Sequence, residues 1–319
     1  MTLTRPHRSH PAAEEWFESR SYRHDRFAAV AALADRKRAS GLEVSLVLPT
    51  REVAGTIGLV LDAIEALRSR AALVDQVVVV DAASSDGTAD VARRRGADVH
   101  DESDLLAEMG PVLGKGDAMW RALSVAGGDI VLYADADSAS FGEHFIHGML
   151  GPLLCEPEVR FVKATYHRPF TAPDGTVMDD AGRVTELTAK PLLALFYPEL
   201  AGFGQPLAGE VAARRDLLCA IPFCAGYAVE AGMLIDVLRR VGLGAMAQVD
   251  LGSRVNRSQP LLALNSMSYA VARAILRRAG CAVDAESYLH AASQPAGVRL
   301  ERRRVPVVER PPLAELGDG

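Results

Sequence analysis

The first part of the chain alternates short apolar runs with longer segments whose apolar residues recur at helical spacing. An uninterrupted apolar run is typical of a strand buried on both faces, whereas spacing of three to four residues predicts a helix. Strands that alternate with helices indicate an α/β fold with a mostly parallel central sheet and right-handed crossovers. The predicted strands are 44–49, 75–81, a short strand from Val99 and the run ending before Asp135, and the predicted helices are 27–38, 56–67, one ending at Arg95 and one ending at Val125.

The pattern changes on either side of this region, and we expect four segments. Residues 1–40 are polar and charged, and are expected to form an N-terminal arm that packs on a neighbour. Residues 41–165 form the α/β half, and residues 166–260 mix loops, a short strand and helices. Residues 261–319 contain an amphipathic helix over 261–280 and then a charged, proline-rich tail or dimer arm.

Composition excludes several kinds of partner. The 319 residues include 35 Lys and Arg against 41 Asp and Glu, a formal charge of -6, so there is no broad basic field for nucleic acid. No apolar run approaches the ~20 residues of a membrane span, and the N-terminus lacks the apolar core of a signal peptide. We therefore expect a cytoplasmic protein whose four cysteines, lacking metal-ligand spacing, are small core residues.

Two aspartates follow the last predicted strand of the α/β half. Side chains alternate along a strand, so Asp135 and Asp137 should leave on the same side, with Ala136 pointing away. Mg²⁺ and Mn²⁺ take oxygen ligands, often one or two protein carboxylates plus substrate phosphates. The pattern therefore suits a metal-bound nucleotide diphosphate, although turn chemistry also places aspartates at strand ends.

Polar residues follow two further predicted strands, at 49–52 and 81–88. In open α/β sheets, ligands bind beyond the carboxyl ends of the strands. We therefore expect these residues to meet residues 135–138 at one crevice, with Asp81 placed for a ribose or base contact.

A helix start in the second half has features of an anion site. Residues 182–187 precede an apolar helical stretch and offer backbone amides, an arginine and a hydroxyl. An ordinary capped helix with a surface arginine explains the segment equally well.

Six segments, taken together and in this order, resemble the glucosyl-3-phosphoglycerate synthase family over roughly residues 40–280. They are VSLVLP at 44–49, DAASSDGT at 81–88, GKGDAMW at 114–120, GRVTEL at 182–187, QPLAGE at 205–210 and PFCAGYAVE at 222–230. The resemblance implies a GT-A (Rossmann-like) fold, Mg²⁺ or Mn²⁺, and a nucleotide-sugar donor, with UDP-glucose favoured and a GDP-sugar as the alternative. It further implies a small phosphorylated or carboxylated acceptor, retention of anomeric configuration and a homodimer. Relatives with a mannosyl donor share the architecture.

The resemblance also assigns roles to residues of this chain. Residues 41–165 would bind the nucleotide-sugar and residues 166–260 the acceptor. Donor-side residues would be Pro49, Thr50, Arg51, Glu52, Asp81, Ala82, Lys115, Asp135 and Ala136. Lys115, Asp135, Asp137 and Glu230 would form the catalytic group, and Asp137 and Asn256 would hold the metal. Gly182, Arg183, Thr185 and Ser258 would bind the acceptor.

Four positions depart from the family pattern. Val53 and Ala82 lie where a glutamate and a serine are usual, close to the nucleotide. Asn256 replaces a metal-binding histidine, and Ser258 replaces an asparagine at the acceptor site. An amide oxygen can still bind Mg²⁺ or Mn²⁺, but it discriminates less well than imidazole among softer metals. These changes indicate an altered substrate.

Other functions remain open at this stage. A glycosyltransferase of specialised metabolism could use the same site with another acceptor or donor nucleotide. A nucleotidyltransferase is disfavoured because residues 49–58 lack a glycine-rich phosphate loop. A non-catalytic sugar-nucleotide-binding protein is disfavoured by Lys115 and the aspartate pair, and favoured mildly by Ala82 and Asn256. No residue stands out as a covalent nucleophile, which favours attack from the face of the departing phosphate, with a phosphate oxygen as the base.

Overall fold

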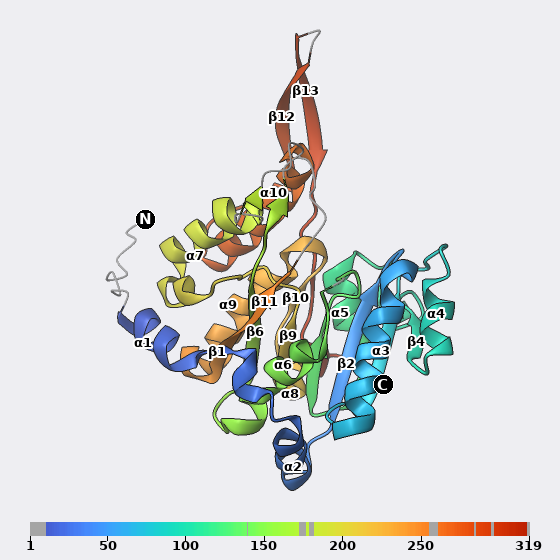
Figure 1. The fold of residues 1–319 in the computed structure, drawn as a ribbon. Helices are drawn as coiled ribbons and strands as arrows, with labels where there is room; N and C mark the ends of the chain where they lie inside the picture. Colours follow the sequence, from blue (N-terminus) through green and yellow to red (C-terminus); the bar gives the residue numbers. More distant parts are fainter. Residues whose placement is uncertain are drawn as a thin grey trace.

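A sheet of eight strands forms the centre of the protein (Figure 1). The computed structural model describes residues 11–138, 140–171, 177–178, 182–254, 261–283, 285–294 and 297–317. In spatial order the strands are β1 (Ser21–Arg23), β11 (Met246–Ser253), β6 (Phe161–His167), β9 (Val211–Arg214), β5 (Ile130–Tyr133), β2 (Val44–Thr50), β3 (Gln76–Asp81) and β4 (Asp98–Asp101). Strand β9 runs antiparallel to both neighbours, and the other adjacent pairs are parallel.

Helices cover both faces of this sheet, and three two-stranded pairs lie outside it. The helices are α1 (Pro11–Arg20), α2 (Val30–Ser40), α3 (Ala54–Ala71), α4 (Thr88–Arg94), α5 (Lys115–Ala122), α6 (Glu143–Cys155), α7 (Lys190–Phe196), α8 (Arg215–Cys219), α9 (Val229–Val241) and α10 (Leu264–Arg278). A π-helical turn, η3 (Thr185–Ala189), leads into α7. The pairs are β7 (Phe170–Thr171) with β8 (Val177–Met178), β10 (Phe223–Cys224) with β14 (Glu309–Arg310), and β12 (Ser287–Gln294) with β13 (Gly297–Arg304).

Two hydrophobic cores, one on each face of the sheet, explain the continuous apolar runs. In β2, Val47 packs in the core that contains Trp120 of α5, while its neighbours Leu46 and Leu48 pack in the core that contains Phe145 of α6. Successive side chains of a strand point to opposite faces, so a strand covered on both sides needs apolar residues at every position. The predicted α/β class and the mostly parallel sheet are therefore confirmed.

The predicted elements of the α/β half match the structure closely, with shifts at the ends. The helix predicted over 27–38 begins later, at Val30, because a short 3₁₀ turn occupies His24–Phe27. The helix predicted to end at Val125 begins at Lys115 and ends at Ala122. None of the described helices is both long enough and apolar enough to cross a membrane.

Both ends of the described chain contribute to the main body. Strand β1 adds to the sheet beside β11, and the indole nitrogen of Trp16 donates to the carbonyl of Met246 at 2.7 Å. The β12–β13 hairpin stands out from the body (Figure 1). After it the chain returns, so the predicted tail includes β14, which pairs with β10.

Three histidines gather where the 3₁₀ turn η1 (His24–Phe27) meets α6. The ring of His24 lies 5.0 Å from that of His144 and 6.1 Å from that of His147. His147 is only 7% exposed, and its Nδ1 has no hydrogen-bond partner among the described residues. Burial, followed by the charges of His24 and His144, lowers the pKa of His147 to about 4, with Glu143 opposing.

This cluster predicts a loss of stability in mild acid. The unfolded chain binds a proton at His147 below pH ~6.5 that the folded chain does not take up until about pH 4. Folding stability should therefore fall as pH drops through this window, and His147→Gln should remove about 2 kcal/mol of that fall. Urea unfolding of wild type and His147→Gln at pH 7.5 and pH 4.5 measures this fall in the free energy of unfolding. Above pH 7 the free energies of unfolding of the two proteins should differ by a constant amount. An unchanged pH dependence in the variant would contradict the prediction.

Candidate active site

The carboxyl ends of β2, β3 and β5 lie next to one another, because β2 pairs with both of the other strands. Thr50 ends β2, Asp81 ends β3, and Asp135 follows β5 by two residues. The structure thus brings together the three polar segments that sequence analysis assigned to one crevice.

Asp81 is engaged within the protein. Its Oδ1 accepts hydrogen bonds from the hydroxyls of Thr50, at 2.8 Å, and Ser84, at 2.7 Å, and its Oδ2 accepts one from the Ser84 amide at 2.8 Å. The side chain is buried. Its observed effect is to order the loop after β3, while a ribose or base contact stays a prediction.

The loops after β2 and β3 are linked by reciprocal hydrogen bonds. Glu52, in a left-handed conformation with φ 52°, donates its amide to the Ser84 hydroxyl and accepts the Ser85 amide at Oε1, both at 2.8 Å. Asp86 and Thr88 accept the amides of residues 54 and 53, at the start of α3. The α3 N-terminus is therefore occupied by side chains. Pro49, Arg51 and Ala82 flank these loops with partly or fully exposed surface.

Lys115 joins two of the predicted catalytic carboxylates. Its Nζ lies 2.7 Å from Asp135 Oδ1 and 3.2 Å from Glu230 Oε1, which comes from the first turn of α9. Burial lowers the pKa of Lys115, but the carboxylates of Asp135 and Glu230 outweigh it and raise that pKa well above its usual range. The lysine is therefore protonated at neutral pH.

Arg254, which sequence analysis did not select, contacts both aspartates. It follows β11 and is 2% exposed. Its Nη2 donates to Asp135 Oδ2 at 2.9 Å and to Asp137 Oδ1 at 3.3 Å, so both carboxylates lie on one side of the strand end. Its Nη1 donates to Tyr166 Oη at 3.1 Å and to Glu210 Oε1. Burial raises the pKa of Asp135, but Lys115 and Arg254 more than offset this, and that pKa falls well below its usual range.

Glu210 and Lys163 extend the network behind Asp135. Both are buried, and Lys163 donates to the carbonyl of Ala208. Burial lowers the pKa of Lys163 to about 8, with Glu230 and Glu210 opposing. Glu210 lies in the segment 205–210 that resembles the family, and Arg254 lies two residues before Asn256, but a single sequence gives no sign that a glutamate and an arginine are buried as partners.

We call these seven side chains the charged cluster: Lys115, Lys163, Arg254, Asp135, Asp137, Glu210 and Glu230. With three positive and four negative groups, its net charge is -1 when all are ionised. Such a cluster attracts a cation.

Asp137 is the carboxylate available to a metal. Its side chain is 69% exposed, whereas that of Asp135 is 22% exposed and held by two cations. Within the described residues, no three His, Cys, Asp or Glu side chains form a metal-binding group. One exposed carboxylate fits Mg²⁺ or Mn²⁺ when a substrate diphosphate supplies further oxygens. The predicted ligand Asn256 and the acceptor residue Ser258 lie outside the described residues.

The predicted acceptor residues lie at the start of η3. Gly182 has φ 135°, a conformation that favours glycine, and its carbonyl accepts the amide of Glu186 at 2.9 Å. Thr185 is 2% exposed, and Arg183 is half-buried. The side-chain oxygen of Gln205 faces Gly182 and is buried without a hydrogen-bond partner among the described residues.

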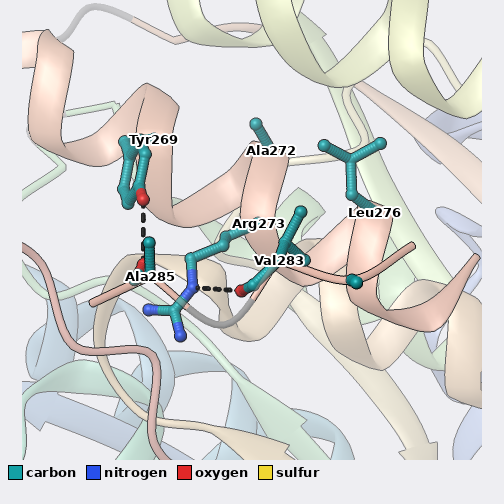
Figure 2. A pocket seen from close by; sticks show the side chains of 7 residues that line it. Tyr269, Ala272, Arg273, Leu276, Val283 and Ala285 are labelled. Carbon is teal, nitrogen blue, oxygen red and sulfur yellow. Dashed lines mark hydrogen bonds between the residues drawn. The ribbon is translucent and has the colours of Figure 1, made fainter. Parts of the chain in front are cut away.

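A separate cavity of about 300 Å³ lies beside α10 (Figure 2). Tyr269 donates to the carbonyl of Ala285 at 2.9 Å, and Arg273 donates to that of Val283 at 3.0 Å. None of the predicted site residues lines it. Its lining residues are Tyr269, Ala272, Arg273, Leu276, Ala282, Val283 and Ala285.

The mostly parallel sheet, with carboxylates and cations gathered beyond its central strands, defines a glycosyltransferase of the GT-A fold class. Residues 45–179 match the family described as Glycosyl transferase family 2. Glucosyl-3-phosphoglycerate synthase of Petrotoga mobilis is 38% identical over 260 residues, covering 81% of this chain and 80% of the relative. That of Mycobacterium tuberculosis is 40% identical over 280 residues, covering 86% of each. The chain belongs to the glucosyl-3-phosphoglycerate synthase family.

Solved structures agree with this assignment. Mannosyl-3-phosphoglycerate synthase from Rubrobacter xylanophilus superposes with a TM-score of 0.88 at 54% identity, covering 96% of this chain and 98% of that chain. Glucosyl-3-phosphoglycerate synthase from Mycobacterium tuberculosis, in complex with Mn²⁺, UDP and phosphoglyceric acid, superposes with a TM-score of 0.81 at 37% identity. The superposition covers 91% of this chain and 95% of that chain.

Gly209 offers a test of the cluster geometry. A Cβ at this position would lie 2.6 Å from Lys115 Nζ and closer still to Asp135 Oδ2. Both atoms end movable side chains, so Gly209→Ala should shift the charges while leaving the fold intact. We expect glycosyl transfer to fall by about 10- to 100-fold with little change in thermal unfolding. Gly244→Ala, where a Cβ meets nothing within 4 Å, is the matched control. Full activity in Gly209→Ala would show that the cluster tolerates displacement.

Proposed function

We propose that the protein transfers a hexosyl group from a nucleotide-sugar, with UDP-glucose favoured, to 3-phosphoglycerate with retention of anomeric configuration. The observation that carries the proposal is the arrangement at Asp135: this carboxylate is held between Lys115 and Arg254, and Asp137 beside it is left open to a cation. The Mycobacterium tuberculosis relative, crystallised with Mn²⁺, UDP and phosphoglyceric acid, supports the choice of substrates.

Asp137, with Asn256, would hold the metal. When bound, Mg²⁺ or Mn²⁺ neutralises the diphosphate and stabilises it as a leaving group. Lys115 and Arg254 present fixed positive charge on the same side of the sheet, where negative charge develops on the departing phosphate. Because they are already oriented by Asp135 and Glu210, little reorganisation is needed during transfer.

The remaining predicted residues would place the two substrates. Asp135 and Glu230 are proposed to orient sugar hydroxyls. Both are ion-paired with Lys115, which makes them weak nucleophiles and favours same-face attack without a glycosyl-enzyme intermediate. The nucleoside would lie against Pro49, Thr50, Arg51, Glu52, Asp81, Ala82 and Ala136. The acceptor phosphate and carboxylate would bind Gly182, Arg183, Thr185 and Ser258.

A mannosyl donor is the second candidate. The specific observation in its favour is the 54% identity to a mannosyl-3-phosphoglycerate synthase, against 37% for the Mycobacterium tuberculosis glucosyl enzyme in the structural comparison. Val53 and Ala82, which depart from the glucosyl pattern, lie near the proposed nucleoside site.

We further propose a homodimer. The β12–β13 hairpin projects from the body and exposes Leu289, Val298 and Leu300, with 58%, 72% and 64% of each residue accessible. Contact with a second copy would cover this apolar surface. Light scattering of the purified chain tests the proposal, and a monomer at micromolar concentration would exclude it.

A cytoplasmic location is also part of the proposal. Its support is the state of Cys155, Cys219, Cys224 and Cys281, which are free thiols in the structure. Reduced cysteines are usual where glutathione keeps thiols reduced. Fractionation of the native host would test it, and recovery outside the cytoplasm would exclude it.

The function is tested by product analysis. The protein is incubated with Mg²⁺ or Mn²⁺ and 3-phosphoglycerate, with UDP-glucose and GDP-mannose supplied together and then separately. Mass spectrometry should show a hexosyl-phosphoglycerate, and NMR of the product should show the anomeric configuration of the donor. A product from another acceptor, inversion, or a trapped glycosyl-enzyme would each contradict a stated part of the proposal.

Metal dependence gives a second test. Chelation by EDTA should abolish transfer, and Mn²⁺ or Mg²⁺ should restore it. Asp137→Asn should raise the metal concentration needed for half-maximal activity by about 10- to 100-fold, because one charged oxygen ligand is lost. Asp104→Asn, on an exposed loop, is the control. Unchanged Mn²⁺ affinity in Asp137→Asn, measured by calorimetry, would remove Asp137 from the metal site.

A further inference from the structure

The segment at residues 305–311, which we call the C-terminal strap, lies against the active-site helices. Its strand β14 pairs antiparallel with β10, and the carbonyl of Val308 accepts the amide of Ala225 at 2.8 Å. The indole nitrogen of Trp120 in α5 donates to the carbonyl of Pro311 at 2.8 Å. The strap therefore contacts α5, which begins with Lys115, and β10, which precedes Glu230.

Arg310 is the charged centre of the strap. Its Nε and Nη2 bind the two carboxylate oxygens of Asp117 at 2.8 and 2.7 Å. Its Nη1 and Nη2 also donate to the carbonyls of Met109, at 2.7 Å, and Pro111, at 3.0 Å. The side chain is 9% exposed and that of Asp117 is fully buried, so this is a desolvated bidentate ion pair.

Asp117 links Arg310 to the turn that precedes Lys115. Besides Arg310, its Oδ2 accepts the amide of Leu113 at 2.9 Å. This bond closes the turn over Gly114, whose φ of 98° sets the direction in which α5 starts. Arg310 thus holds the turn before Lys115 through Asp117 and through two loop carbonyls.

The strap is also tied to β10 and to α9, the helix that carries Glu230. A Cβ on Gly116 would overlap the carbonyl oxygen of Cys224, so the first turn of α5 packs directly on β10. Glu309 in β14 pairs with Arg278 at 2.8 Å, and Arg278 in turn binds Asp236 of α9. The helix that carries Glu230 is thereby tied to the same strap.

We propose that Arg310 is a positioning residue for sugar transfer: through Asp117 it sets Lys115 against Asp135 and Glu230, and the C-terminal strap completes the active site. The kinetic consequence rests on the proposed function, whereas the effect on Lys115 does not. Asp117 keeps a second cation, Arg121 at 3.3 Å, when Arg310 is lost. The fold should therefore survive the substitution while the position of Lys115 loosens.

Lysine labelling tests this without any substrate. Arg310→Ala, Arg310→Lys and wild type are treated briefly with acetic anhydride and digested, and acetylation is quantified by mass spectrometry. Displacing Lys115 from its carboxylates frees more unprotonated amine, so its labelling should rise about three- to tenfold. Lys37, which lies in α2 outside the charged cluster and is 8% exposed, reports global unfolding and should not change. Lys190, ion-paired with Glu186 and away from the strap, is the local control.

Kinetics supply the second readout. In both Arg310 variants kcat should fall by about 10- to 100-fold. Affinity for UMP, which lacks the β-phosphate that Lys115 is proposed to face, should stay within about twofold, because no hydrogen bond or ion pair joins the loops after β2 and β3 to the strap in the described part of the chain. Arg304→Ala, which removes an exposed arginine of β13, should leave kcat and nucleotide affinity unchanged. If wild type forms no phosphoglycerate product the proposed function fails, and the labelling still decides the role of Arg310.

Two results would overturn the inference. Unchanged Lys115 labelling in both variants would show that the strap does not position the lysine. A joint rise at Lys115 and Lys37 in both variants, with nucleotide affinity falling alongside kcat, would show that Arg310 supports the whole fold instead.

Discussion

The active site depends on a partly buried negative charge at Asp135 that two cations hold in place. Removing a carboxylate from water is costly, and the cost is offset only when well-oriented partners remain beside it. Lys115 approaches from α5 and Arg254 from the end of β11, so each cation comes from a different part of the fold. Glu210 then compensates Arg254, and Glu230 compensates Lys115. Loss of any member leaves another charge unpaired, which makes the cluster a cooperative unit.

The backbone around this unit is shaped to bring the charges together. Gly209 and Gly116 lie where a side chain would collide with the cluster or with β10. The two cores on opposite faces of the sheet keep β5 and β11 fixed, so the strand ends do not move independently. A rigid scaffold of this kind is what allows cations and carboxylates to be oriented before substrate binds.

The strand and helix order from Val44 to Asp137 could be predicted because strands buried on both faces are apolar at every position, as in β2 and β3. Helix α1 and strand β1 lie in the segment expected to be an arm and were not predicted. The antiparallel β9 could not, since its direction is set by β5 and β6, which are distant in sequence. The β12–β13 hairpin exposes apolar residues such as Leu300 as well as charged residues such as Arg299, so its sequence does not separate a buried face from a solvated one. Sequence analysis selects Asp135, Lys115 and Glu230 as site residues, and the structure places the lysine in contact with both carboxylates. Arg254 and Arg310 were not, because an isolated arginine usually indicates surface, and their burial exists only once distant carboxylates are assembled around them.

The charge balance limits what the departures from the family pattern can mean. Three cations and four carboxylates leave one net negative charge, which a divalent cation would convert to one net positive charge, suited to an anionic diphosphate. Asn256 stands where the family has a histidine, and both are neutral as ligands, so the exchange leaves this balance unchanged. What changes is the donor atom, because an amide oxygen is harder than an imidazole nitrogen and favours Mg²⁺ over softer ions. On the proposed function, the substitution therefore bears on which metal is preferred, while Asp137 and the cluster behind it would hold that metal.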